Sequence, residues 1–241
     1  MRKFVIGDIH GRMDALEDVL QRTPIDKKKD RLIILGDICD GGEDTKKVID
    51  TLREFEDKIF ILGNHDQWFL DWIKGGVAQN IWLNQGGRFT LLSYGIRFPG
   101  DTSARFTIPT EHVQFMEDHV LFYEDEDAIY VHAGIAWGVN TGLEFSTKED
   151  FLWDRTLIQY AYRQFTTREN MSHYQGKLVI VGHTCTQLLN NKSAPFISDH
   201  VIGLDTGAGH GSKLTIMEIP SKEYWQSKIQ DFKLLRGGNG R

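Results

Sequence analysis

One local pattern recurs along the sequence: a short run of large apolar residues ends in a glycine-containing turn that carries a carboxylate, an amide or an imidazole. Its first occurrence is Phe4-Val5-Ile6, which leads into Gly7-Asp8-Ile9-His10-Gly11. Equivalent runs precede Gly36-Asp37-Ile38-Cys39-Asp40, Gly63-Asn64-His65-Asp66, His132-Ala133-Gly134, Gly182-His183-Thr184 and Asp205-Thr206-Gly207. Short apolar runs bounded by turn residues are typical of buried strands. Because α/β sheets place ligand sites at the carboxyl ends of their strands, we expect these turns to converge on one site.

Amphipathic helices are predicted between several of these strands. The apolar residues of segment 13–22 recur at helical spacing, which indicates the helix of a βαβ unit. Further helices are expected over residues 44–55, from Asn64 to the glycine pair 75–76, from Thr110, and from the capping box at 147–150 to about residue 165. Residues 77–109 have weaker periodicity and more turn residues, so we predict loops and a short helix over the mouth of the site.

The carboxyl-terminal part is expected to contain strands, turns and a short helix. Residues 214–219 are predicted to pair antiparallel with the strand at 201–204. In the tail, Trp225, Ile229 and Phe232 fall on one face of a helix.

Length and composition fit one soluble domain. With 241 residues, 40% hydrophobic and 26% charged, we expect a single α/β domain over 1–220 and a tail over 221–241 that packs on it as a short helix.

The two cysteines, Cys39 and Cys185, form no disulfide framework and favour a cytoplasmic location. Asp8 is too near the amino terminus for a signal peptide, and no apolar run is long enough to span a membrane. A net charge of −6 disfavours a dedicated nucleic-acid surface, and the oligomeric state stays open.

The polar residues at the strand ends form a set suited to metal ions. They comprise two carboxylates, one amide and three imidazoles: Asp8, Asp37, Asn64, His10, His132 and His183. This mixture of oxygen and nitrogen ligands favours manganese, iron or zinc over calcium or magnesium, and manganese is our first expectation. The set is too large for one tetrahedral site but suits two divalent metal ions that share a carboxylate.

A dinuclear centre of this kind predicts hydrolysis of a phosphoester. Two divalent cations keep a net positive charge beside two carboxylates, and that charge attracts a phosphate dianion. Metal ions about 3.5–4 Å apart can hold a bridging hydroxide for direct in-line attack on phosphorus, without a covalent intermediate. His65, which follows Asn64, is then expected to be the general acid that protonates the leaving oxygen, with Asp40 as its orienting partner.

Taken in order, these motifs resemble the phosphoprotein phosphatase branch of the calcineurin-like metallophosphoesterases, and its bacterial and phage-lambda-type serine/threonine phosphatases most. Further motifs that carry the resemblance are Trp82-Leu83-Asn84-Gln85-Gly86-Gly87, Ser93-Tyr94-Gly95, Leu152-Trp153-Asp154-Arg155 and Asp205-Thr206-Gly207. The resemblance extends over about residues 1–219 and leaves out the tail. It implies a four-layer αββα sandwich.

The resemblance also implies roles for individual residues. One metal ion would be held by Asp8, His10 and the bridging Asp37, and the second by Asp37, Asn64, His132 and His183. Arg155 and Asn64 would bind the substrate phosphate, and His65 paired with Asp40 would be the general acid.

One position departs from the family pattern. The second motif of the family normally ends Asp-Arg-Gly, and its arginine grips the substrate phosphate, whereas this chain has Gly41 there. Loss of a bidentate clamp weakens transition-state binding by roughly 2–4 kcal/mol if nothing replaces it. The sequence leaves Arg12, Lys46 and Arg88 as alternative replacements.

The leading prediction is a phosphomonoesterase that acts on phosphoserine or phosphothreonine in proteins, or on a small phosphoester. The missing arginine and the segment 77–109 keep open a nucleotide hydrolase that cleaves a dinucleoside polyphosphate or a phosphodiester. Asp40 favours the phosphatase, because the related symmetrical diadenosine tetraphosphatases usually lack an acid there. A non-catalytic binder of phosphorylated ligands is the third alternative, and the pair His65 and Asp40 argues against it.

Other residues that often mark sites have no motif here. The remaining histidines are expected at the surface or in loops: His112, His119, His173, His200 and His210. Trp68, Trp72 and Trp82 are expected in the core rather than in a base-stacking platform, because few basic residues lie between them.

Overall fold

The computed structural model describes residues 1–137, 141–168 and 177–228. Its strands are β1 (Lys3–Ile6), β2 (Arg31–Ile34), β3 (Asp57–Phe60), β4 (Phe122–Glu124), β5 (Ala128–Val131), β6 (Leu178–Val181), β7 (Phe196–Ile197), β8 (Val201–Gly203), β9 (Thr215–Ile219) and β10 (Tyr224–Gln226). Its helices are α1 (Met13–Arg22), α2 (Thr45–Arg53), α3 (Asn64–Ile73), α4 (Asn80–Trp82), α5 (Arg88–Ser93), α6 (Thr110–Glu117), α7 (Lys148–Trp153), α8 (Thr156–Thr167) and α9 (Gln187–Asn190).

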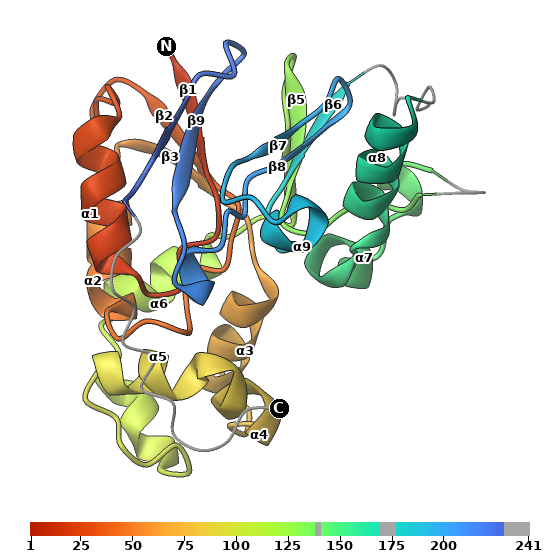
Figure 1. Cartoon of the computed structure of the whole chain (residues 1–241). Coiled ribbons are helices and arrows are strands. Elements are labelled where there is room, and N and C mark those ends of the chain that lie inside the picture. The colour runs from red at the N-terminus through yellow and green to blue at the C-terminus, as the bar shows by residue number, and fades with distance from the viewer. Residues whose placement is uncertain (138–140, 169–176, 229–241) are drawn as a thin grey trace.

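The described strands form two five-stranded sheets (Figure 1). The strand order is β10-β9-β1-β2-β3 in the first sheet and β4-β5-β6-β8-β7 in the second. Helices α1 and α2 lie on the outer side of the first sheet, and α7 and α8 on the outer side of the second (Figure 1). The predicted single α/β domain with αββα layers is therefore confirmed. The parallel pairing of β1 with β2 confirms the predicted βαβ unit around α1.

The side chains of β1 alternate between two cores, as the pleat of a strand requires. Phe4 and Ile6 belong to the hydrophobic cluster that the first sheet forms with α1 and α2. Val5 points the other way and belongs to the cluster between the sheets, together with Tyr130 and Ile180 of the second sheet. Because both faces of each sheet are covered, the strands read as continuous apolar runs in the sequence.

The single helix predicted from the capping box to about residue 165 is wrong in one respect, because the chain divides it into α7 and α8. The capping box itself is present. The division lies at Asp154, whose carboxylate accepts the backbone N–H groups of Thr156 and Leu157, each at 3.0 Å. These bonds satisfy the first N–H groups of a new helix. The resulting turn carries Arg155.

Two expectations about the carboxyl-terminal part are wrong. Strand β9 pairs antiparallel with β1 in the first sheet, and not with β8, which already lies between β6 and β7 in the second. Trp225 is in strand β10, which pairs with β9, so this part of the tail is not helical. Ile229 and Phe232 lie outside the described residues.

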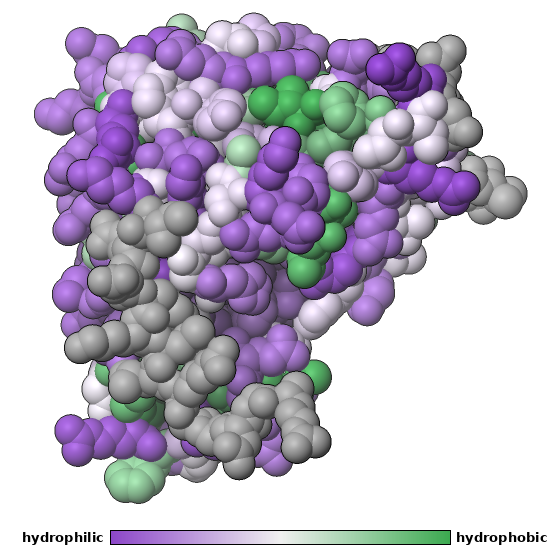
Figure 2. Space-filling view, viewed as in Figure 1, coloured by the Kyte–Doolittle hydropathy of each residue, from purple (hydrophilic) through white to green (hydrophobic). Residues whose placement is uncertain are grey.

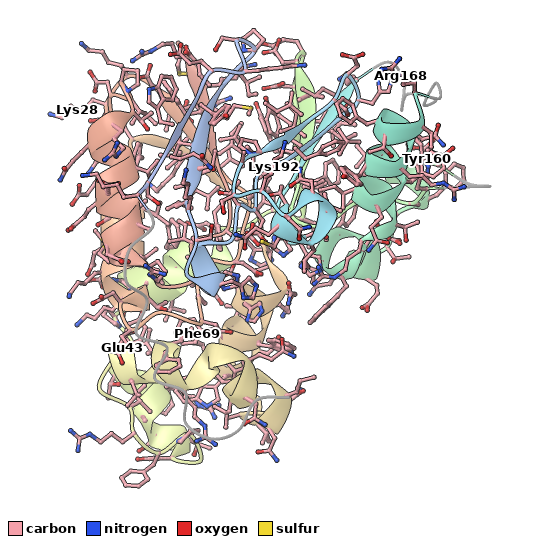
Figure 3. The ribbon with its side chains drawn as sticks, in the orientation of Figure 1. Lys28, Glu43, Phe69, Tyr160, Arg168 and Lys192 are labelled. Carbon is pink, nitrogen blue, oxygen red and sulfur yellow. The ribbon has the colours of Figure 1, made fainter. Side chains whose placement is uncertain are left out.

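Segment 77–109 is more helical than predicted. It contains α4, α5 and two further helical turns, Leu83–Gly87 and Thr102–Thr107. Phe69 of α3 (Figure 3) contacts the rings of Trp82 and Tyr94 at centroid distances of 6.4 and 5.7 Å. Trp72 and Trp82 are buried, as expected. This aromatic cluster fastens the segment to α3.

His112 contradicts the expectation of a surface position. It is buried, with Nε2 2.8 Å from a carboxylate oxygen of Asp50 and Nδ1 2.8 Å from the hydroxyl of Tyr94. His210 is exposed, as expected, and His173 lies outside the described residues.

The face of the molecule in Figure 2 is mostly hydrophilic and shows only small apolar areas. In the parts of the chain that the structure describes, no helix combines the length and apolarity needed to cross a bilayer.

Candidate functional site

The turns after strands of both sheets meet at one end of the sandwich. The backbone N–H of His183, after β6, donates to both carboxylate oxygens of Asp8, after β1, at 3.2 and 3.0 Å. The carboxylate of Asp37, after β2, accepts the backbone N–H of His65 at 2.9 Å. The Oδ1 atom of Asn64 lies 3.0 Å from Nε2 of His132. The structure therefore brings together the strand-end residues that the sequence singled out.

Backbone carbonyls orient two of the three imidazoles in the same way. The Nδ1 atom of His10 lies 3.0 Å from the carbonyl oxygen of Cys39, and that of His132 lies 2.8 Å from the carbonyl oxygen of Leu35. A ring held through Nδ1–H keeps the lone pair of Nε2 for a metal ion.

The Nε2 atoms point toward the carboxylates. They lie 3.7 Å (His10) and 3.5 Å (His132) from the same oxygen of Asp37. The buried Nε2 of His183 has no hydrogen-bond partner among the described residues. Two groups of side chains have ligand atoms within 4.8 Å of one another: His10, Asp37 and His65, and Asp37, His132 and His183. Asp37 belongs to both groups, and these histidine and aspartate side chains are positioned to bind metal.

Burial sets the electrostatics of the site. It lowers the pKa of His132 to about 4 and that of His183 to about 2, so both imidazoles are neutral near pH 7. Burial also raises the pKa of Asp37 to about 6, and burial together with the charges of Asp205 and Asp37 raises the pKa of Asp8 well above its usual value. Neutral imidazoles beside crowded carboxylates suit divalent cations. The cation binds the lone pairs of the imidazoles and compensates the negative charges of the carboxylates.

His65 and Asp40 form a hydrogen-bonded pair. The Nδ1 atom of His65 lies 2.7 Å from Oδ2 of Asp40, and 13% of the His65 side chain is exposed. Burial lowers the pKa of His65, but the charge of Asp37 and the hydrogen bond to Asp40 outweigh it and raise the pKa to about 9. The imidazole therefore carries a proton at neutral pH, as a general acid requires.

Four residues of the site have left-handed backbone conformations. Their φ angles are 52° at His10, 47° at Asp37, 69° at Asp40 and 58° at His183. Such conformations cost a non-glycine residue about 1–3 kcal/mol and persist where the surroundings enforce them, typically at functional sites.

The sequence profile described as Metallophos, calcineurin-like phosphoesterase, matches residues 1–187 of this chain. The chain belongs to this family. It is therefore a metallophosphoesterase and a hydrolase, and the predicted membership in the calcineurin-like group is confirmed.

Relatives of this metallophosphoesterase include two tetraphosphatases. The asymmetrical bis(5'-nucleosyl)-tetraphosphatase PrpE of Oceanobacillus iheyensis is 25% identical over 239 residues, which cover 93% of this chain and 91% of that protein. The protein of the same name from Anoxybacillus flavithermus is 24% identical over 234 residues, which cover 91% of each chain. Neither name places the chain in the phosphoprotein phosphatase branch.

Solved structures share the fold. The crystal structure of a proposed diadenosine tetraphosphatase has a TM-score of 0.62 at 18% identity and covers 96% of this chain and 95% of its own. A protein serine/threonine phosphatase from Saccharomyces cerevisiae has a TM-score of 0.55 at 11% identity, with 96% and 81% covered. At these identities the likeness concerns the fold alone.

Arg155 lies beside this metallophosphoesterase site. Its Nη1 atom lies 3.4 Å from both the carbonyl oxygen of His183 and the hydroxyl of Thr184. Its charge opposes the rise in the pKa of Asp37 that burial causes. The break between α7 and α8 directs it there, which the sequence pattern did not indicate.

The other three basic candidates are placed differently. Arg12 is buried and donates twice to Asp14, at 2.8 and 2.7 Å, and to the carbonyl oxygen of Ala208 at 3.0 Å. Lys46 is exposed on α2. Arg88 lines a different cavity, of ≈ 560 Å³, within segment 77–109.

Gly41 cannot simply be exchanged for the family arginine. Its φ angle is 88°, a left-handed conformation that side chains other than glycine adopt at a cost of about 1–2 kcal/mol. A Cβ atom there would also contact the Cβ atom and the carbonyl oxygen of His10, each at 3.4 Å. The glycine that replaces the family arginine therefore matches the left-handed backbone conformation at position 41.

Two partly buried indoles flank the site. The ring of Trp68 meets the ring of His65 edge to face at 5.1 Å and that of Trp153 at 5.2 Å. Trp153 in turn meets His183 at 6.1 Å. The sequence predicts Trp68 in the core, whereas it is partly buried, and nothing in the linear pattern brings Trp153 beside it.

Sequence reasoning also left Asp66 without a role. Its buried carboxylate accepts the backbone N–H groups of Ile38 at 3.0 Å and of Cys39 and Gly63 at 3.1 Å. It thereby joins the turn after β2 to the start of α3. The signal for it was the acidic residue three positions after Gly63, where a helix start favours a carboxylate.

Proposed function

We propose that this metallophosphoesterase hydrolyses dinucleoside polyphosphates of the bis(5'-nucleosyl)-tetraphosphate class. The observation that carries the proposal is the pair of tetraphosphatase relatives, which align over more than nine-tenths of both chains. The glycine at position 41 agrees with it, since the phosphate grip typical of the protein phosphatase pattern is missing.

The residues that would hold two metal ions are those of the sequence prediction: Asp8, His10 and Asp37 for one, and Asp37, Asn64, His132 and His183 for the other. The orphaned Nε2 of His183 and the shared position of Asp37 support this assignment. Bound there, manganese, iron or zinc would supply positive charge to the phosphoryl oxygens and acidify water for attack on phosphorus.

Substrate contacts come from the rim of the site. Arg155 is proposed to bind phosphoryl oxygens as a charged donor, with the amide of Asn64 beside it. Trp68 and Trp153 offer flat apolar faces next to His65 and His183, which suit the stacking of a nucleoside base. His65 is proposed to donate its proton to the leaving oxygen while Asp40 holds the imidazole.

One observation favours a second function, that of a phosphomonoesterase acting on phosphoserine or phosphothreonine. A serine alkoxide is a poor leaving group and needs a proton, whereas a nucleotide phosphate leaves readily as an anion. The 2.7 Å contact between His65 and Asp40 supplies such an acid. The protein phosphatase therefore stays as the alternative.

The test is a substrate panel with the metal-stripped chain refilled separately with manganese, iron and zinc. It comprises a dinucleoside tetraphosphate, a bis-aryl phosphate, an aryl phosphate and a phosphopeptide. We expect the highest kcat/KM on the tetraphosphate. Chromatography of the products then shows the position of cleavage, because asymmetrical cleavage gives a mono- and a triphosphate and symmetrical cleavage gives two diphosphates.

Other outcomes assign the function differently. A preference for the phosphopeptide would overturn the proposal and restore the phosphatase. Tight binding of metal and phosphate with no turnover of any substrate would support a non-catalytic binder.

A further inference from the structure

The carboxylate of Asp40 is surrounded by hydrogen-bond donors. It is buried, with 1% of the residue exposed. Its Oδ2 atom accepts from Nδ1 of His65 at 2.7 Å and from the indole Nε1 of Trp82 at 3.0 Å. Its Oδ1 atom accepts from the hydroxyl of Thr90 at 2.7 Å and lies 3.1 Å from the same indole nitrogen. One carboxylate thus connects the histidine to two neutral donors from a distant part of the chain.

We propose that Trp82 and Thr90 are positioning residues, which fix the rotation of the Asp40 carboxylate so that its charge faces His65. The inference rests on the proposed function, in which His65 protonates the leaving group. An indole N–H and a hydroxyl orient a carboxylate without cancelling its charge, whereas an arginine or lysine would compete with the imidazole for it.

Thr90 holds Asp40 from two sides. Its hydroxyl donates to the carboxylate and accepts the backbone N–H of Asp40 at 2.8 Å. Both the side chain and the main chain of Asp40 are therefore tied to α5. This matters because Asp40 has a left-handed backbone, with φ 69°, that the surroundings must maintain.

A pair of glycines allows Trp82 to come this close. A Cβ atom at Gly87 would lie 2.4 Å from Nε1 of Trp82, and one at Gly86 would lie 2.4 Å from the backbone nitrogen of Gly41. Gly86 also has a φ angle of 109°. Neither position accepts a side chain, so the contact between Trp82 and Asp40 depends on both glycines.

The chain contains matched controls for a purely structural role. Trp72 is as buried as Trp82, and their rings lie 6.3 Å apart, but the indole of Trp72 donates to the carbonyl oxygen of Pro99 at 3.3 Å. Thr23 is a buried threonine whose hydroxyl donates to the carbonyl oxygen of Val19 at 2.7 Å, away from the site. Loss of packing beside Trp82, or of a buried hydrogen bond elsewhere, can thus be measured while both side-chain donors to Asp40, Trp82 and Thr90, are kept.

The experiment compares Trp82→Phe, Thr90→Val and Thr90→Ser with Trp72→Phe and Thr23→Val in the manganese-loaded enzyme. The substrates are phenyl phosphate, which has a poor leaving group, and 4-nitrophenyl phosphate, which has a good one. We expect kcat for phenyl phosphate to fall about tenfold in the first two variants, with KM within about twofold and a much smaller loss on 4-nitrophenyl phosphate. Thr90→Ser keeps the hydroxyl and should restore kcat. The two controls should change stability alone.

A second measurement is independent of turnover. In the ¹⁵N-labelled chain, the Nε1–H resonance of Trp82 should move and exchange faster in Asp40→Asn, while that of Trp72 stays in place. An unmoved Trp82 resonance would overturn the inference whatever the substrate, because the contact would not exist in solution.

The kinetic outcomes separate two kinds of failure. Equal losses on both substrates, or losses as large in the control variants, would assign Trp82 and Thr90 to packing alone and sink the inference. His65→Asn is assayed in parallel. If it slows phenyl phosphate hydrolysis while the Trp82 and Thr90 variants do not, the inference alone fails. If His65→Asn does not slow it either, the proposed role of His65 fails and the inference with it.

Discussion

The backbone N–H of His183 donates to both carboxylate oxygens of Asp8. The two residues are 175 positions apart and follow strands of different sheets, so this contact joins the two halves of the site. It also fixes the rotation of a carboxylate whose pKa is already raised by burial. We therefore propose that metal binding depends on the negative charge of the Asp8 side chain and not only on the position of its oxygen atoms.

Asp8→Asn tests this point, because asparagine keeps an oxygen for the N–H of His183 but carries no charge. We expect a folded protein that binds less metal and is, without metal, at least as stable as wild type, since a crowded buried carboxylate has been removed. Metal content by elemental analysis and urea unfolding measure both effects. Asp18→Asn, at a partly buried carboxylate on α1 that is paired with Arg22, is the control. Full metal content in Asp8→Asn would exclude Asp8 as a ligand.

His65→Asn should leave the metal content unchanged and slow the release of poor leaving groups by about a hundredfold, within the range of general acid catalysis. Loss on good leaving groups should be small, because these leave without a proton. His112→Asn is a close match, since His112 is also buried and hydrogen-bonded to an aspartate, Asp50. It should lower stability with no leaving-group dependence. Equal sensitivity of the two variants would remove His65 from the role of acid.

The fold was largely predictable because its central strands β1, β2, β5, β6 and β8 are buried almost completely on both faces. Apolar runs such as Phe4-Val5-Ile6 mark them without need of an alternating pattern, and the turns that follow identify the residues that meet in space. The strand that pairs with β9 was not predictable, since an apolar strand fits either sheet. Its place beside β1 depends on which strand of a sheet still has an unpaired edge. The division of α7 from α8 depends on the cap that Asp154 provides. In the sequence, an aspartate that caps a new helix cannot be told from one in the middle of a helix.

The parts of the site that escaped prediction come from outside the strand ends. Trp82 is predicted as a core residue and Trp153 only as part of a family motif, and their positions beside Asp40 and His183 follow from how α4 and α7 pack. The conformation at Gly41 is another example, because the sequence shows a missing arginine but not the left-handed backbone that disfavours a side chain there.

The affinity for metal should decrease as the pH decreases, over a range set by the pKa values that burial shifts. Because burial lowers the pKa of His132 to about 4 and that of His183 to about 2, these imidazoles do not compete for protons above pH 5. Burial raises the pKa of Asp37 to about 6, so this carboxylate takes up a proton as the pH falls from 7.5 to 5. The stabilisation that metal gives is then fully present above pH 7 and is lost as the pH falls through about 6.

Titration calorimetry with manganese at pH 7.5, 6 and 5 measures this effect. From the titration of Asp37 we expect about fivefold weaker binding at pH 5 than at pH 6, with proton release that grows as the pH falls. An affinity independent of pH over this range would contradict the assignment of Asp37 as the shared ligand.

Gly41→Arg is the direct test of whether the missing clamp can be restored. The left-handed φ of 88° should make the variant less stable by about 1–2 kcal/mol, and the arginine should not raise kcat/KM on a phosphopeptide or an aryl phosphate. Gly41→Ala should lose a similar amount of stability, while Gly41→Asn should lose less, because asparagine tolerates this conformation. Urea unfolding and kinetics on the three variants separate backbone strain from side-chain chemistry. A Gly41→Arg protein of unchanged stability and higher phosphatase activity would show that the turn after β2 rearranges, and it would favour the protein phosphatase over the tetraphosphatase.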